Sequence, residues 1–154
     1  MKPYNTNERR GHRCVVKWPK KLKLGKGSTY NDMCFINARY GIEIGENTVI
    51  GPRCIILSTE HVIKNIDIEQ NANDRSSWCG DDPSRRIKGE KTIIGSDVWV
   101  GSGVIILAGS RIPDKCVIGA GTLINKTNCK CIKSGDIVVN ETKLRILGNR
   151  KDYE

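Results

Sequence analysis

Aromatic residues and histidines are scarce in this sequence, and long apolar runs are missing. The 154 residues include one Phe, three Trp, four Tyr and two His. Aromatic side chains do not interleave with the basic residues as base stacking requires, and no nucleic-acid motif is present, so we expect no nucleic-acid partner. No apolar run is long enough to span a bilayer or to form the hydrophobic part of a signal peptide, so no membrane span is predicted.

Cysteines number seven, and this odd count favours free thiols over a disulfide framework. We therefore expect a cytoplasmic protein. Cys129 and Cys131 are separated by a single residue, which is the wrong spacing for a zinc site, and two histidines are too few to complete one. The sequence predicts no metal site.

Positive charge is in excess, with a formal net charge of +9. Eight basic residues gather near the N-terminus: Arg9, Arg10, Arg13, Lys17, Lys20, Lys21, Lys23 and Lys26. Such a cluster either attracts small polyanionic molecules or is simply a solvated surface. The sequence leaves both interpretations open.

A six-residue period dominates the stretch from residue 94 to residue 129. Its lead residues are aliphatic: Ile94, Val100, Ile106, Ile112, Ile118 and Ile124. Small or β-branched residues follow four places later: Val98, Val104, Ser110, Cys116 and Thr122. A helix with about 3.6 residues per turn would spread such a row around its axis. A triangular coil of three short strands and three tight corners instead places every lead residue inward, so the period predicts a β-solenoid.

This stretch resembles the signature segment of the hexapeptide-repeat acyltransferases, above all the sugar and xenobiotic O-acetyltransferases that use acetyl-CoA. The resemblance extends over roughly residues 41–147. It implies a left-handed parallel β-helix, against the usual preference for right-handed crossovers. It also implies acetyl-CoA as co-substrate, a sugar or nucleotide sugar as acceptor, and a homotrimer with active sites at subunit interfaces.

The same spacing continues more weakly upstream, where it contains a shift of two residues. The two registers are Leu24, Tyr30, Ile36 and Ile42, followed by Ile44, Ile50 and Ile56. A two-residue bulge near residues 38–41 would account for the shift. We predict a β-helix over residues 24–139, preceded by a basic lead-in of residues 1–23 with a short strand near Val15, and followed by a tail of residues 140–154.

Between residues 58 and 91 the period disappears. Long irregular loops in compact domains are usually functional or disordered, and this one leaves the coil beside His61 and re-enters just before Trp99. We predict that this excursion projects from the coil and forms one wall of the acceptor site. The alternative is that it is a mobile surface loop without a function. Trp78 is a candidate to contact a sugar and its phosphate, together with Arg75, Arg85 or Arg86.

Acyl transfer from a thioester requires a base that deprotonates the acceptor and stabilisation of the tetrahedral oxyanion. Histidine suits the role of base because its unperturbed pKa lies near neutrality. The resemblance assigns this role to His61, seventeen residues after Ile44; His12 lies in the basic lead-in. Asn31 matches an asparagine that assists near the acceptor in the family, and Asn37 is the competing position if the bulge is placed differently. Either asparagine could instead cap a turn.

The resemblance also assigns residues to the coenzyme. Trp99 matches an aromatic residue near the thioester, and Ser102 and Ala120 match positions that line the pantetheine arm or are simply small corner residues. Asn125 and Lys126 match a Thr-Lys pair near the phosphates, and Lys143 matches a basic position near the 3′-phosphate. The tail has lost the Gly and Pro that family members often carry there.

Three function classes follow from these observations. We predict an acetyl-CoA-dependent O-acetyltransferase acting on a sugar or nucleotide-sugar hydroxyl. N-acetylation of an amino sugar and a non-catalytic β-helix scaffold are the alternatives. A γ-class carbonic anhydrase shares the fold but needs three zinc-binding histidines, and the chain has two.

Overall fold

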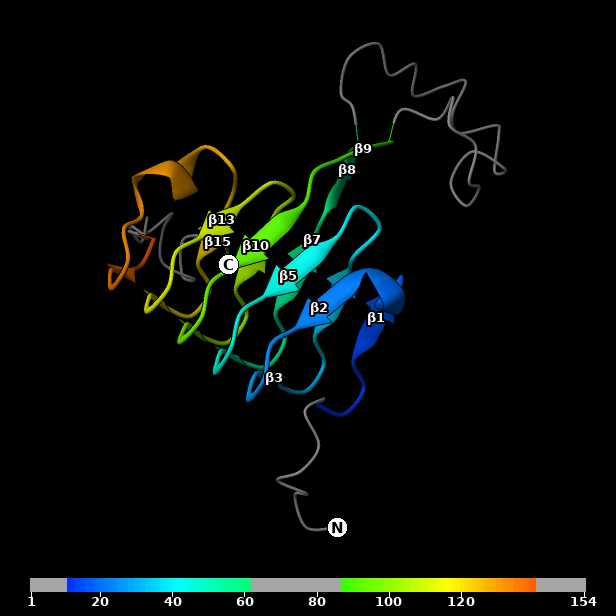
Figure 1. Cartoon of the computed structure of the whole chain (residues 1–154), viewed down its shortest axis with the longest axis horizontal. Coiled ribbons are helices and arrows are strands. Elements are labelled where there is room, and N and C mark those ends of the chain that lie inside the picture. Colours follow the sequence, from blue (N-terminus) through cyan, green and yellow to red (C-terminus); the bar gives the residue numbers. More distant parts are fainter. Residues whose placement is uncertain (1–10, 62–86, 141–154) are drawn as a thin grey trace, which may run out of the picture.

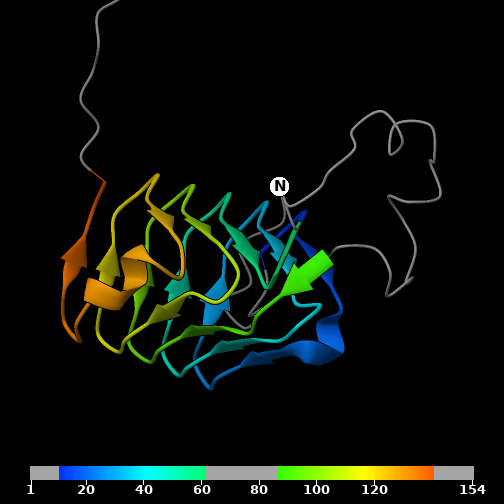
Figure 2. The same cartoon turned by 90° about the horizontal axis from the view of Figure 1, so that it is seen from above.

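The computed structural model describes residues 11–61 and 87–140, which form a parallel β-helix (Figure 1). Each turn of the chain, here called a coil, passes through short strands joined by tight corners, and strands of successive coils pair in parallel. We name the three resulting sheets I, II and III, in the order in which the chain meets them. Figure 2 shows the coils stacked side by side, from the blue N-terminal end to the orange C-terminal end.

The three sheets differ little in size. Sheet I contains β1 (Val15–Lys17), β4 (Phe35–Asn37), β7 (Ile55–Leu57), β12 (Ile105–Ile106) and β15 (Leu123–Ile124). Sheet II contains β2 (Leu22–Leu24), β5 (Ile42–Ile44), β10 (Thr92–Ile94) and β13 (Arg111–Ile112). Sheet III contains β3 (Thr29–Tyr30), β6 (Val49–Ile50), β11 (Trp99–Val100), β14 (Val117–Ile118) and β16 (Ile137–Val138).

Helical structure is slight. Within the described ranges the helical elements are two 3-10 helices, η1 (Pro19–Lys21) and η3 (Asn128–Cys131). In the same ranges no helix has the length and apolar character needed to cross a membrane. The predicted all-β fold, a parallel β-helix built from hexapeptide repeats, is confirmed.

The interior is filled by the residues that recur every six positions. All six predicted lead residues are at most 2% exposed: Ile94, Val100, Ile106, Ile112, Ile118 and Ile124. The small residues that follow them are also buried, and Cys116 is among them. Cys54 is likewise fully buried on a corner. The predicted inward orientation of the lead residues is therefore confirmed. Within a strand the residue next to each lead residue points outward, because side chains alternate along a strand.

The predicted shift of two residues is present. In the upstream coils Tyr30 pairs with Ile50 and Ile36 with Ile56, a separation of 20 residues. Downstream, Val100 pairs with Ile118, a separation of 18 residues. The two extra residues lie in the turn at residues 38–41, where the Gly41 amide donates to the Ala38 carbonyl over 2.9 Å. Parallel pairing also includes β1, which is in register with β4.

The excursion leaves from the corner between sheets I and II, here called the I–II corner. β8 (Thr59–His61) and β9 (Ile87–Gly89) pair antiparallel there as a two-stranded ribbon. Figure 1 shows this ribbon leaving the side of the β-helix between β7 and β10. The coil resumes at Thr92, whose hydroxyl donates to the Leu57 carbonyl over 2.7 Å.

Candidate active site

His61 is the last residue of β8, and its backbone lies opposite Ile87 of β9. The base of this ribbon is anchored at Ser58. The Ser58 hydroxyl donates to the Asn37 carbonyl over 2.9 Å, and the Ser58 carbonyl accepts the Glu90 amide over 3.1 Å. The chain therefore holds His61 three residues away from a buried, hydrogen-bonded corner.

The two candidate asparagines lie on different corners. Asn31 follows β3, where sheet III passes into sheet I, and its side-chain amide donates to the Ile50 carbonyl over 3.2 Å. Asn37 ends β4 beside the ribbon base, and its side-chain oxygen accepts the Arg39 amide at 3.3 Å. The structure thus brings Asn37, rather than Asn31, next to the start of β8.

Three predicted coenzyme residues lie along sheet III and the corner that follows it, here called the III–I corner. The Trp99 side chain points outward from β11 and is 61% exposed. Ser102 and Ala120 are exposed on the III–I corners of adjacent coils. The Ser102 carbonyl accepts the Gly121 amide at 2.9 Å, and a Cβ on Gly101 would lie 2.6 Å from the Ala120 nitrogen. Position 101 therefore has no room for a side chain.

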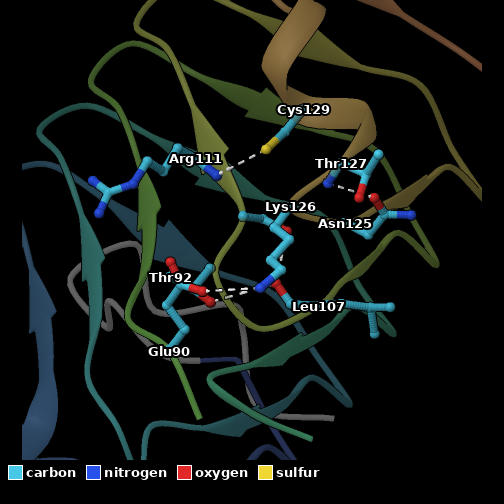
Figure 3. Close-up of polar contacts among 9 residues, drawn as sticks. Glu90, Thr92, Leu107, Arg111, Asn125, Lys126, Thr127 and Cys129 are labelled. Atoms are coloured by element: carbon cyan, nitrogen blue, oxygen red, sulfur yellow. Dashed lines mark hydrogen bonds and ion pairs between the residues drawn. The ribbon is translucent and has the colours of Figure 1, made fainter.

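Lys126 lies near the I–II corner, and its ammonium is 3.5 Å from the Glu90 carboxylate, as Figure 3 shows. Both side chains are about half exposed. Asn125 is differently placed: its side-chain oxygen accepts the amides of Thr127 and Asn128 at 2.8 and 2.9 Å. Asn125 therefore closes the turn, whereas Lys126 presents a cation that an anionic ligand could share.

The candidate residues therefore fall into two groups. Asn31, Trp99, Ser102 and Ala120 lie on sheet III or the III–I corner, and Asn37, His61, Asn125 and Lys126 lie beside the I–II corner. Sheet I separates the two groups within one chain. Trp78, Arg85 and Lys143 lie outside the described residues.

Cys34 and Cys54 are buried at corners of the coil. The Cys34 and Cys54 thiols donate to the carbonyls of Gly51 and Gly101, each over 3.2 Å. Hydrogen bonding to Cys54 and burial raise the pKa of Cys34, which keeps this thiol protonated and unsuited to nucleophilic attack. Within residues 11–61 and 87–140 no group of three or more metal-ligating side chains gathers.

Two residues beside the ribbon were not among the predicted site residues. Glu90 pairs with Lys126, and Tyr40 lies in the turn at residues 38–41. The signal for Tyr40 was the shift of two residues, because an insertion at a corner places extra side chains there. Nothing in the repeat pattern marks Glu90, since its role depends on how the chain returns from the excursion.

Comparison with known proteins gives matches among acetyltransferases. The galactoside O-acetyltransferase of Escherichia coli (strain K12) is 31% identical over 105 residues, which cover 68% of this chain and 45% of the relative. A maltose O-acetyltransferase structure from Clostridium difficile 630 has a TM-score of 0.62 and 25% identity, covering 83% of this chain and 59% of that one. A galactoside acetyltransferase in complex with coenzyme A has a TM-score of 0.54 and 26% identity, covering 73% and 52%.

The chain spans about half the length of the curated relatives it matches. The bacterial transferase hexapeptide (six repeats) family matches residues 91–126, the stretch in which the period of six is regular. The chain therefore carries the bacterial transferase hexapeptide repeat and resembles the hexapeptide-repeat acetyltransferases, as its sequence predicts.

Proposed function

We propose that this protein transfers an acetyl group from acetyl-CoA to a hydroxyl of a sugar or nucleotide sugar, with His61 as general base. The observation that carries the proposal is the position of His61. It ends β8 where the regular coil is interrupted, in a chain that resembles O-acetyltransferases of galactoside and maltose. We further propose that the protein works in the cytoplasm, where free thiols such as Cys34 stay reduced.

The proposed reaction needs one proton carrier. Neutral His61 accepts the proton of the acceptor hydroxyl as the oxygen attacks the thioester carbonyl. The tetrahedral intermediate then collapses, the carbon–sulfur bond breaks, and the imidazolium returns its proton to the departing CoA thiolate. The products are the acetyl ester and CoA, and His61 ends in its starting protonation state.

For the coenzyme we propose contacts from Trp99, Ser102, Ala120 and Lys126, with Lys143 toward the 3′-phosphate. Exposure of Trp99 and of the Lys126 ammonium supports this assignment. The coenzyme A bound to a galactoside acetyltransferase of the same fold also supports it. Asn125 contributes indirectly, because its hydrogen bonds to Thr127 and Asn128 fix the turn that carries Lys126.

We propose that the protein acts as a homotrimer. Two adjacent faces of the β-helix are mainly apolar on the outside, although Lys17 lies on sheet I. The apolar residues are Val15, Phe35, Ile55, Leu57, Ile105 and Leu123 on sheet I, and Val49, Trp99, Val117 and Ile137 on sheet III. The outward face of sheet II is instead charged, with Lys23, Glu43 and Arg111. Two different apolar faces that meet at one corner suit a heterologous contact, which closes into a ring.

Such a ring would also unite the two groups of candidate residues. When sheet III of one copy packs against sheet I of the next, Trp99 of the first copy approaches the I–II corner of the second. That corner carries His61 and Lys126. The separation of the two groups within one chain is therefore an argument for an active site between subunits.

Replacement of His61 tests the proposal. His61→Ala is expected to lower kcat by roughly 10²–10⁴-fold, the usual contribution of a positioned base, while the Kd for acetyl-CoA changes little. Turnover is measured with acetyl-CoA and a panel of sugar acceptors, and acetyl-CoA binding by calorimetry. In the wild type kcat should rise with pH through a near-neutral pKa, because the base must be unprotonated.

His12→Ala is the matched control, since His12 is the only other histidine of the chain. It should leave kcat close to the wild-type value. If His61→Ala retained more than about a tenth of the wild-type kcat when chemistry limits turnover, general-base catalysis by His61 would be excluded. A scaffold without catalytic activity would then be the better assignment.

A further inference from the structure

Three side chains stack at the I–II corner on the N-terminal side of the excursion. The Arg39 guanidinium carbon lies 5.4 Å from the centroid of the Trp18 ring and 5.9 Å from that of the Tyr40 ring. Both distances fall within the range of cation–π attraction. Trp18 and Tyr40 are 37% and 40% exposed, so the stack lies on the surface beside the ribbon.

At the Trp18 end of the stack the backbone has a positive φ, as it has at several other corners of the coil. Trp18 has a left-handed conformation, with φ 54° and ψ 57°, directly before Pro19. Bulky L-residues rarely adopt this conformation, and it persists only where the surroundings impose it. Lys21 contributes to this, because its ammonium donates to the Arg39 carbonyl over 2.9 Å. Trp18 is therefore fixed against the corner that carries Arg39.

Tyr40, at the other end of the stack, contacts the ribbon. The Tyr40 amide donates to the Ser58 hydroxyl over 3.0 Å, at the residue where the coil is interrupted. A Cβ on Gly89 of β9 would overlap the Tyr40 ring. Gly89 is thus needed for space, because the ring lies directly against its backbone. Gly89 pairs with Thr59, and two residues further along β8 is His61.

We propose that Tyr40, fixed by Arg39 and Trp18, is a positioning residue for His61. An isolated two-stranded ribbon has little stability of its own, and β8–β9 is joined to the coil at one end. A ring packed flat on β9 sets the angle at which the ribbon leaves the coil, and with it the position of the base. General-base catalysis depends on that position, since a displacement of about 1 Å can cost about 100-fold in rate. The inference rests on the proposed function.

The test is a double-mutant cycle between Tyr40 and Gly89. Tyr40→Ala should lower kcat by roughly 10–100-fold, with an unchanged Kd for acetyl-CoA and an unchanged apparent pKa in the pH–rate profile. Tyr40→Phe should retain near-wild-type kcat, because the phenylalanine ring preserves the contact with Gly89. Gly89→Ala should lower kcat in the wild-type background and have little further effect in the Tyr40→Ala background, where the ring has been removed.

Several outcomes would overturn the inference. One is an unchanged kcat for Tyr40→Ala, and another is an equal loss from Gly89→Ala in both backgrounds. A parallel loss of acetyl-CoA binding and thermal stability would assign the stack a structural role alone. Should Tyr40→Ala fail to fold, Tyr40→Leu takes its place in the cycle. If His61→Ala is active, the proposed function fails; if His61→Ala is inactive and Tyr40→Ala is normal, only the positioning role fails.

Discussion

Among the residues proposed to bind the coenzyme, Lys126 has an ionic partner within the chain. Its ammonium is 3.5 Å from the Glu90 carboxylate, with both side chains about half exposed. An exposed pair of this kind contributes only about 0–1 kcal/mol. A phosphate group, with more charge and more acceptor oxygens, would therefore displace Glu90 from Lys126.

Lys126→Ala is expected to weaken acetyl-CoA binding by about 1–3 kcal/mol, the scale of a charge-assisted contact. Glu90→Gln should act in the opposite direction and tighten binding by about two- to fivefold, because it removes the competing carboxylate. The effect of Glu90→Gln should vanish in the Lys126→Ala background. Titration calorimetry of the four proteins measures all of these values, and a CoA analogue without the 3′-phosphate shows which phosphate is involved.

An unchanged Kd for a folded Lys126→Ala variant would remove Lys126 from the coenzyme site. An effect of Glu90→Gln that persisted without Lys126 would mean that Glu90 acts on the ligand by another route. The ion pair would then be only a surface contact.

At the scale of the strand, β10 places two identical side chains in opposite environments. Ile94 is 1% exposed in the interior, whereas Ile93 points outward from sheet II and is only partly buried. Ile94→Ala should lower the free energy of unfolding by about 2–5 kcal/mol, through lost burial and the cavity left behind. Ile93→Ala should cost about 1 kcal/mol or less. Urea denaturation at one protein concentration compares them, and equal losses would contradict the assignment of the inner face.

Sheet II also carries a charged ladder that links three coils on its outer face. Glu43 lies between Lys23 at 2.8 Å and Lys91 at 2.7 Å. Hydrogen bonds from these two lysines hold the pKa of Glu43 down to about 2. Because the folded-state pKa lies below that of the unfolded chain, the ionised carboxylate favours the folded state above its ordinary pKa.

This contribution should therefore be present at neutral pH and be lost as the pH falls from the ordinary carboxyl range to about 2. The measurement is the difference in Tm between the wild type and Glu43→Gln across this range. The difference should be small, because the group is near the solvent, and it should shrink in high salt. A difference that stayed constant with pH would show that the ladder does not titrate in this way.

At the scale of the whole molecule, the outer faces of the β-helix predict how copies associate. Ile105 points outward from the apolar face of sheet I, and Ile93 points outward from the charged face of sheet II. Ile105→Lys should convert the proposed trimer to monomers and abolish activity, because the active site would lose one of its two halves. Ile93→Lys should leave both unchanged. Light scattering after gel filtration gives the masses, and a wild type that is itself monomeric would overturn the arrangement.

Much of the architecture follows from the sequence because the repeat is local. The lead residues from Ile94 to Ile124 share one environment, so their spacing alone predicts which side chains point inward. Even the shift between Ile42 and Ile44 is visible, since two inserted residues at a corner leave the strands on either side in register. The end of the period at Ser58 also marks the start of the strand that carries His61, whereas the role of His61 as base stays a proposal that comes from the family resemblance.

The partners of each candidate residue were decided only by the tertiary structure. The return of the chain from the excursion brings Glu90 to Lys126. The contact between Tyr40 and Gly89 joins segments on either side of residues 62–86. A period of six contains no information about such contacts. It describes which residues are equivalent in successive coils, and not the direction in which an inserted ribbon leaves the coil. The sequence therefore determines the β-helix and the point of its interruption. The path of the returning chain determines which side chains surround the ribbon and hold it in place.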